Sequence, residues 1–421
     1  MAGGSSDMGV HMTLREEAEQ IIRESIQAVL PDEAVRKALA GRKFGPGKLY
    51  MVAAGKAGWQ MAKTAADVLG DRLEAGVVVT KYDHAKGEIP RTACFEAGHP
   101  VPDENSFLAT QAALELAAKA AEEDEVLFLL SGGGSALFEK PLVSGAELQD
   151  ITRQLLARGA DIVEMNTIRK RLSAVKGGRF AIACAPAHVY SIVLSDILGD
   201  PLDMIASGPA YPDSSTCAQA AAIAEKYRLK LTDEARELLK RETPKALTNV
   251  ETQITGSVSG LCRAAAHACG ELGYETTILT DRLACEAREA GRFMGAIAKT
   301  YQGTEKSLAF LAGGETMVHL TGGGKGGRNQ ELALAAAEEI AGLNGTAVFS
   351  FGSDGTDGPT DAAGGFCDAD TKGKLAAEGI SVYDVLQDND AYHALKKVDG
   401  LVVTGATGTN VNDVAALLIR R

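Results

Sequence analysis

The stretch Leu49–Leu69, LYMVAAGKAGWQMAKTAADVL, has the pattern of a strand, a glycine turn and a helix. Its first residues are apolar at consecutive positions, which is typical of a strand covered on both faces of a sheet. The same order recurs along the chain, and the runs VLFLL (126–130) and SIVLS (191–195) predict two more covered strands. Because strands alternate with helix-like segments, we expect an α/β protein with a largely parallel sheet.

The length of the chain predicts more than one domain. Its 421 residues are too many for one ordinary hydrophobic core. Periodicity breaks between Thr243 and Gly256, where Pro244 and several polar residues indicate a boundary or linker. We therefore expect an N-terminal domain over residues 13–245 and a C-terminal domain over residues 256–421.

The composition excludes several classes of protein. The chain has 43 basic and 56 acidic residues and a net charge of −13, which disfavours sequence-independent nucleic-acid binding. Its seven cysteines include no CxxC pair, as expected for reduced thiols in the cytoplasm. No apolar run reaches the length of a membrane span. We expect a cytoplasmic protein, and the sequence does not determine its oligomeric state.

Five strand ends carry turns of small residues, which favour binding of phosphate groups. Such turns leave backbone N–H groups accessible, and a following helix adds the positive end of its dipole. Tight connections between strands and helices would also explain any single turn. A Walker A loop, a dinucleotide fingerprint and the protein-kinase signatures are all absent. The five turns are Ala54–Gly58, Ser131–Ser135, Gly313–Thr316, Gly322–Arg328 and Gly405–Thr409.

Charged residues near these turns suggest how anions and metal ions would be held. Arg169 and Lys176 belong to a basic run that could face phosphate or carboxylate, although a basic surface stripe is an equal alternative. The loop SDGTDGPTDAAGG supplies three carboxylates that suit Mg²⁺, against the alternative of a solvated turn with Asx caps. These carboxylates are Asp354, Asp357 and Asp361.

Several long motifs, taken in order, resemble the glycerate 2-kinase family, whose C-terminal part is often called the MOFRL domain. The resemblance covers the chain from about Thr13 to Arg421. It implies two α/β domains with a cleft between them, the first Rossmann-like. It also implies transfer of a phosphoryl group from ATP to the 2-hydroxyl of D-glycerate, with Mg²⁺, giving 2-phosphoglycerate. The motifs are AAGKAG, GHPVPDENS, LLSGGGSALF, NTIRKRLSAVKGGR, LSDILGDPLDMIASGP, GGRNQELAL, GSDGTDGPTDAAG and TGATGTNVNDV.

The resemblance implies that Lys56 and Arg328 are catalytic basic groups. Phosphoryl transfer also needs a group that accepts the hydroxyl proton, and we expect Asp196, with Asp361 as the alternative. His99, in a Pro-rich loop before a helix, is more typical of a structural histidine. The expected substrate- and phosphate-binding residues are Ser131, Gly132, Gly133, Gly134, Ser135, Arg169, Lys176, Gly313, Gly314, Glu315, Thr316, Lys325 and Asn329.

Two other functions stay open at this point. The family also carries an older name as a hydroxypyruvate reductase, which would use NADH or NADPH, although the dinucleotide fingerprint is missing. A nucleotide-binding module without catalysis is the second alternative. In either kinase or reductase, the partner is a small molecule rather than a nucleic acid or a membrane.

Overall fold

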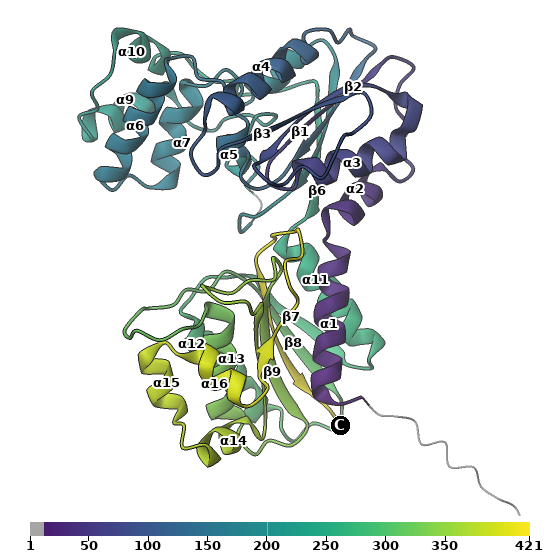
Figure 1. Ribbon diagram of the computed structural model, residues 1–421, viewed down its shortest axis with the longest axis vertical. Helices are drawn as coiled ribbons and strands as arrows, with labels where there is room; N and C mark the ends of the chain where they lie inside the picture. The colour runs from purple at the N-terminus through teal and green to yellow at the C-terminus, as the bar shows by residue number, and fades with distance from the viewer. Residues whose placement is uncertain (1–11, 200) are drawn as a thin grey trace, which may run out of the picture. The chain divides into compact units, whose positions relative to one another are not determined.

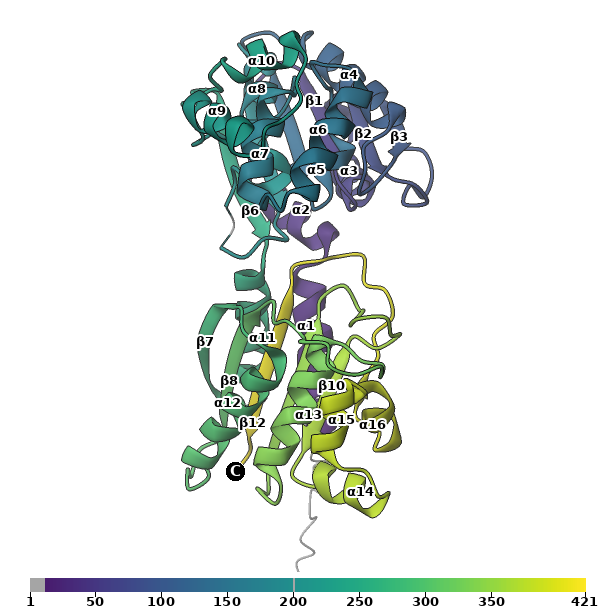
Figure 2. The ribbon, with the colours of Figure 1, turned by 90° about the vertical axis from the view of Figure 1, so that its left-hand side faces the viewer.

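The computed structural model describes residues 12–199 and 201–421, and the chain forms two compact units. The first unit contains Val29–Ser257. The second unit combines residues 12–28 with Val258–Arg421. Each unit is an α/β structure with its own six-stranded sheet, so the predicted class of two α/β domains is confirmed (Figures 1 and 2).

The sheet of the first unit is parallel at every strand pair. Its order is β3-β2-β1-β4-β5-β6, the order of doubly wound dinucleotide-binding folds, which confirms the Rossmann-like prediction. The chain moves outward in one direction after β1 and in the other after β4, so the topological switch point lies between these strands. The strands are β1 (Leu49–Ala54), β2 (Leu73–Lys81), β3 (Thr92–Ala97), β4 (Glu125–Leu130), β5 (His188–Leu194) and β6 (Val250–Gly256).

Helices cover this sheet because its central strands are apolar on both faces. All six residues of β1 are buried, as are most of those in β4 and β5. Alanines of α4 and the aromatic ring of Phe180 pack against them in one core. A separate apolar cluster joins α6, α7, α9 and α10. The helices are α2 (Pro31–Leu39), α3 (Gly58–Leu69), α4 (Glu104–Ala117), α5 (Gly134–Leu137), α6 (Gly145–Ala157), α7 (Ile162–Arg171), α8 (Arg179–Cys184), α9 (Cys217–Lys226) and α10 (Asp233–Leu239).

The segment predicted as a linker is instead part of this sheet. Strand β6 pairs in parallel with β5, and the first unit continues to Ser257. Polar residues hid the strand from sequence analysis because β6 is at the sheet edge and most of its side chains are at least partly exposed. Edge strands need not carry the continuous apolar pattern of covered strands.

The sheet of the second unit is mixed, with the order β11-β10-β9-β12-β8-β7. Among the described strand pairs of this sheet, only β7–β8 is parallel, and the C-terminal strand β12 lies antiparallel between β8 and β9. All seven residues of β12 are buried. The strands are β7 (Glu275–Leu283), β8 (Leu308–Gly314), β9 (Thr346–Gly352), β10 (Gly364–Asp368), β11 (Leu401–Val402) and β12 (Asp413–Ile419).

The first helix of the chain belongs to the second unit, whereas the sequence placed residues 13–28 in the N-terminal domain. Helix α1 (Leu14–Ala28) lies along α11 (Val258–Glu271), as Figure 1 shows. The buried Tyr274 hydroxyl donates to the Glu17 carboxylate, which secures the helix. The remaining helices are α12 (Ala287–Thr300), α13 (Arg328–Ile340), α14 (Thr371–Ala377), α15 (Val382–Asp388) and α16 (Ala391–Lys397).

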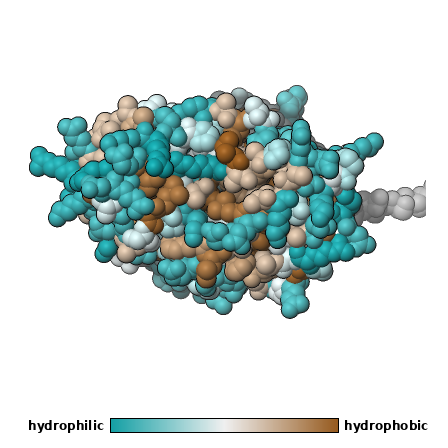
Figure 3. Space-filling view, turned by 90° about the horizontal axis from the view of Figure 1, so that it is seen from above, coloured by the Kyte–Doolittle hydropathy of each residue, from teal (hydrophilic) through white to brown (hydrophobic). Residues whose placement is uncertain are grey.

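Polar side chains cover most of the face drawn in Figure 3, with apolar groups scattered between them. Leu108 on α4 and Leu156 on α6 are among the exposed apolar residues of the first unit. Within residues 12–199 and 201–421, no helix combines the length and apolar character that crossing a membrane requires.

Candidate functional site

Two glycine-containing turns meet at the switch point of the first sheet. The Lys56 amide donates to the Gly132 carbonyl over 2.8 Å, and the Ala57 amide donates to Ser131 Oγ over 3.1 Å. Gly55 has a φ of 121°, and a Cβ there would lie 2.2 Å from Ser131 Oγ. The turns after β1 and β4 therefore form one tightly bonded frame, whose position is where ligands bind in open α/β sheets.

Side chains converge on this frame where Gly132 and Gly133 leave space. A Cβ on Gly132 would lie 2.1 Å from a carboxylate oxygen of Asp196, which follows β5. A Cβ on Gly133 would lie 3.1 Å from both the Lys56 Cγ and the His99 ring. The structure thus brings together the predicted residues Lys56 and Asp196, and it adds His99. We call Lys56, His99, Asp196 and the turn Ser131–Ser135 the switch-point site.

Two basic residues predicted to bind substrate lie behind this turn instead. Lys176 is fully buried and donates to the Ser135 carbonyl over 2.7 Å, beside the Glu139 carboxylate at 3.1 Å. Burial lowers the pKa of Lys176 to about 8, although Glu139 opposes this shift. Arg169 donates to the same carbonyl over 3.3 Å. Both side chains thus hold the turn through the Ser135 carbonyl. Because the Lys176 side chain is also fully buried, its contacts here are structural.

The rest of the basic run is also held inside the first unit. The buried Lys170 ammonium lies 2.9 Å from the buried Asp213 carboxylate. Arg171 donates to Ser215, and Arg179 donates to the Lys170 carbonyl. Lys170 and Arg171 are thus paired inside the fold rather than on a surface stripe, because buried charges are kept only where they are paired.

A second charged cluster lies at the start of α13 in the second unit. Arg328 donates to both Asp413 oxygens, over 2.5 and 3.1 Å, and to Glu315 over 2.9 Å. These bonds use three of the five N–H groups of the guanidinium. Burial raises the pKa of Asp413 to about 6, although Arg328 opposes the shift. Burial works against the Arg328 charge, but the carboxylates outweigh it and its pKa is raised.

Asp357 caps α13 and is not arranged as a metal ligand. Its carboxylate accepts the backbone N–H groups of Asn329 and Gln330 over 3.1 and 2.9 Å. The side-chain amides of the same two residues donate to it as well. Burial raises the pKa of Asp357, while these bonds lower it. Asn329, predicted to contact substrate, is itself buried between Asp357 and Ser350.

The other two predicted metal ligands are also engaged elsewhere. Asp354 accepts the Thr356 amide over 2.9 Å, the Asx turn that was the alternative interpretation of this loop. Asp361 accepts the Tyr392 hydroxyl over 2.7 Å. Among the described residues, no three His, Cys, Asp or Glu side chains are arranged to hold a metal ion. The structure therefore does not gather the three predicted carboxylates into one magnesium site.

In the Gly322–Gly327 loop, the amides of residues 322–325 all donate to groups of the protein itself. The amides of Thr321 and Gly322 donate to the Asn389 side chain. Those of Gly323 and Lys325 donate to the carboxylates of Asp388 and Asp390. The Lys325 ammonium lies 4.6 Å from the centroid of the Tyr392 ring. These four amides are therefore already hydrogen-bonded at positions where phosphate oxygens were expected.

The glycines at the end of β8 serve close packing. A Cβ on Gly313 would lie 2.3 Å from Cys262 Sγ on α11. A Cβ on Gly314 would lie 2.1 Å from the Leu283 carbonyl on β7. Thr316 is buried, whereas Glu315 is exposed and bonds Arg328 and Asn412. Of these four predicted residues, only Glu315 joins the cluster around Arg328.

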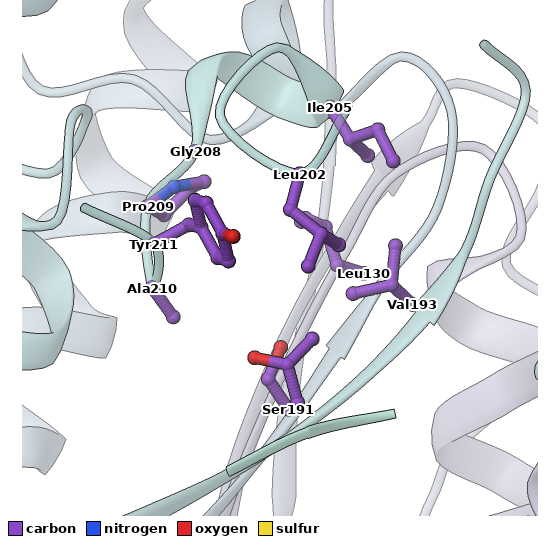
Figure 4. Close-up of a pocket in the computed structure, with 10 residues that line it drawn as sticks. Leu130, Ser191, Val193, Leu202, Ile205, Gly208, Pro209, Ala210 and Tyr211 are labelled. Atoms are coloured by element: carbon purple, nitrogen blue, oxygen red, sulfur yellow. The ribbon is translucent and has the colours of Figure 1, made fainter. Parts of the chain in front are cut away.

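A small cavity lies between β4, β5, β6 and the loop around residues 202–211 (Figure 4). Leu130, Val193 and Leu202 line it together with the Tyr211 ring. Its room for solvent is about 10 Å³, which is scarcely the space of one water molecule. A nucleotide base does not fit this cavity as it stands.

Sequence analysis missed two residues of these clusters. His99 was visible in GHPVPDENS, but its Pro-rich surroundings favoured a structural role. Asp413 ends the motif TGATGTNVND, and nothing in its spacing links it to Arg328, which is 85 residues away in sequence. The pair follows only from the tertiary structure, in which the start of β12 lies beside the end of β8, next to the Glu315 that Arg328 also bonds.

Comparisons with known proteins match the whole length of the chain. A family described as "Domain of unknown function (DUF4147)" matches residues 17–240, and the MOFRL family matches residues 308–413. D-glycerate 2-kinase of Thermotoga maritima is 51% identical over 97% of this chain and 99% of its own. Glycerate 2-kinase of Pyrococcus horikoshii is 41% identical over 97% of this chain and 98% of its own.

The fold comparison agrees with these relatives. The crystal structure of glycerate kinase from Thermotoga maritima matches with a TM-score of 0.93 and 50% identity, covering 96% of this chain and 99% of that one. The match covers nearly the whole of both chains, so it includes both units of this chain, with their two sheets and their two charged clusters.

Proposed function

The chain belongs to the glycerate 2-kinase family, and on that premise we propose that it transfers the γ-phosphoryl group of ATP to the 2-hydroxyl of D-glycerate. The product is 2-phosphoglycerate. The observation that carries the proposal is the convergence of Lys56 and Asp196 on the frame formed by Gly132 and Gly133. A cation and a carboxylate on one backbone frame are two of the groups that phosphoryl transfer requires.

Lys56 is the group we assign to the phosphoryl oxygens. Its backbone is fixed to Gly132, and its side chain is exposed. In the transition state, charge spreads over the oxygens of the transferred group, and a positioned ammonium stabilises that charge. The neighbouring glycines let the phosphoryl group approach the main chain.

Asp196 is the group we assign to the hydroxyl proton of D-glycerate. Gly132 leaves the space that this carboxylate fills, so the acceptor hydroxyl and the phosphoryl group would meet over adjacent glycines. Asp361, the alternative base, is bonded to Tyr392 in the second unit. Comparing Asp196→Asn and Asp361→Asn across pH separates the two, because only loss of the base removes the acidic limb of kcat.

Arg328 is the second catalytic cation we propose. Its bonds to Asp413 and Glu315 fix the guanidinium plane, and two N–H groups are left for an anionic oxygen. A planar donor pair suits a phosphoryl group or a carboxylate. Glu315 belongs to this assignment as the residue that orients Arg328.

Mg²⁺ enters this proposal as part of the ATP substrate. The described carboxylates do not form a resident three-ligand site. Mg²⁺ commonly keeps several waters and is held by nucleotide phosphates with one or two carboxylates. When bound, it would neutralise phosphate charge, while the residues named above position the reacting groups.

The deciding experiment measures ADP release from ATP by the purified chain with D-glycerate, and then identifies the phosphorylated product. We expect ADP release that depends on glycerate and gives 2-phosphoglycerate. Formation of 3-phosphoglycerate would overturn the assigned regiochemistry. Oxidation of NADH or NADPH with hydroxypyruvate would favour the reductase, and ATP binding without turnover would favour the non-catalytic module.

We also propose that the reaction takes place in the cytoplasm. All seven cysteines lie within the described chain and are unpaired, which suits a reducing compartment. Cys94 and Cys285 are exposed. The proposed partners are the two small substrates.

A further inference from the structure

His99 lies in the switch-point site without a role in the mechanism above. Its ring is half-buried against Gly133, with Nε2 at 3.2 Å from the place of a Cβ on that glycine. The Lys56 side chain lies against the same glycine. An imidazole and an ammonium-bearing chain thus meet over one backbone position, and a Cβ there would press on both at 3.1 Å.

Neither the His99 ring nor the Lys56 ammonium has a hydrogen-bond or ion-pair partner in the described chain. Residues 12–199 and 201–421 offer no hydrogen bond or ion pair to either ring nitrogen of His99, nor to the Lys56 ammonium. Polar groups in a folded protein are normally paired, and the exceptions call for an explanation. In a site where substrates carry negative charge, an incoming anion is the partner that both groups lack.

The charges around His99 also favour an anion. Burial lowers the pKa of His99, and Lys56, Lys81 and His84 act in the same direction. The Asp196 carboxylate lies against Gly132 rather than Gly133. In a chain with a net charge of −13, this is a local concentration of cationic groups.

The loops that carry these groups are held in place before any ligand binds. Asp103 caps α4 and accepts the Tyr82 hydroxyl over 2.7 Å, closing the loop that contains His99. The His84 amide donates to Glu96, and the Trp59 indole donates to the Gly87 carbonyl. Such preorganisation reduces the entropy lost when a ligand binds.

We propose that His99 is a substrate-binding residue, whose imidazole and the Lys56 ammonium together hold an anionic oxygen group of a substrate over Gly133. This inference rests on the proposed function. Two groups have the required chemistry, the carboxylate of D-glycerate and a phosphate of ATP. Binding of either would favour the protonated imidazole, because a nearby negative charge stabilises the cation.

The test follows the titration of the His99 ring by NMR in the full-length chain, with the resonance assigned by His99→Gln and by through-bond correlation to the backbone. We expect saturating substrate to raise the midpoint by about one pH unit. A rise with D-glycerate alone identifies the carboxylate, and a rise with ATP alone identifies the phosphate. A midpoint that moves with neither substrate overturns the proposal.

Kinetics provide the second readout. His99→Gln keeps a hydrogen-bonding group but cannot become cationic. We expect it to raise KM about ten-fold for the substrate that moves the titration, with kcat changed less than about three-fold. KM should also lose its rise with pH, since binding is tightest in the wild type when His99 is protonated. The matched control is His267→Gln, an exposed histidine of α11 in the second unit, which should change neither constant.

The outcomes separate this inference from the proposed function. A wild-type chain that releases no ADP with D-glycerate defeats the proposed function itself. A wild-type chain with normal turnover, paired with a His99→Gln variant whose KM is unchanged, defeats only the role of His99. The wild-type titration, with the resonance assigned by through-bond correlation, does not depend on whether any variant folds.

Discussion

Two glycine-rich segments of the molecule look alike in sequence and differ in what surrounds them. In Ser131–Ser135, Gly132 and Gly133 leave space that the side chains of Asp196, Lys56 and His99 reach. In Gly322–Gly327, the amides of residues 322–325 donate to Asp388, Asn389 and Asp390. A glycine turn becomes a ligand site only if the fold leaves its space and its donors to the ligand.

The two cations of the proposed mechanism also differ in their surroundings, since Arg328 is paired with carboxylates and the Lys56 ammonium is not. We expect the largest combined loss of activity and stability from Arg328→Ala. We expect kcat to fall about 100-fold. Stability should also fall, by about 2 kcal/mol, because Asp413 loses its partner while buried and Arg328 is only one-third exposed. Steady-state kinetics and thermal unfolding measure the two effects.

A double variant separates these effects. Arg328→Ala combined with Asp413→Asn removes the unpaired charge, so stability should recover while kcat stays low. Recovery of kcat in the double variant would mean that Arg328 acts on stability alone.

Lys56→Ala should lower kcat by about 100-fold without loss of stability, since the ammonium has no partner in the described chain. Circular dichroism and the melting temperature are expected to match the wild type. Lys63→Ala on α3 is the control, because Lys63 only pairs with Asp67 on the surface. Near-normal turnover of Lys56→Ala would remove this residue from the mechanism.

Asp357→Ala tests the correction of the metal site. The change removes the cap of α13 and leaves buried donors of Asn329 and Gln330 without an acceptor. We expect a loss of about 2 kcal/mol in the free energy of unfolding, measured with denaturant. The Mg²⁺ concentration that gives half-maximal activity should not change. A large increase in that concentration, with stability unchanged, would restore Asp357 as a ligand.

Gly132→Ala compares the two glycine segments directly. A Cβ here would press on Asp196 at 2.1 Å, so we expect kcat to fall about ten-fold as the carboxylate is displaced. Gly323→Ala is the matched control, because a Cβ at Gly323 meets nothing within 4 Å. If both variants behave alike, the distinction between the two segments is wrong.

The covered strands and the parallel sheet of the first unit were predictable because their pattern is local. Six consecutive buried residues in β1 leave little alternative to a strand covered on both faces. Strand β6 was missed because an edge strand can be polar, and the mixed second sheet was missed because β12 pairs with strands far away in sequence.

The candidate site was predictable in part. Lys56 and Asp196 follow apolar strands, and strands that run parallel bring such ends together. Lys176 was misplaced because its charge suggested a ligand, whereas the fold buries it under Ser135. Asp357 and Asn329 were predicted to bind a metal ion and substrate, but they bond each other at the start of α13. Carboxylate and amide side chains can cap a helix as well as bind a ligand, so the sequence does not distinguish the two roles.

The sequence by itself determined the class of fold, the strands with continuous apolar runs and the motifs shared with the glycerate 2-kinase family. These features follow from the local order and spacing of side chains, which do not depend on the rest of the folded structure. Tertiary structure alone decided which glycine turn frames a site, which charges are buried in pairs, and where α1 packs. Those outcomes depend on partners such as Asp388 for Gly323, 65 residues apart, and no local pattern contains them.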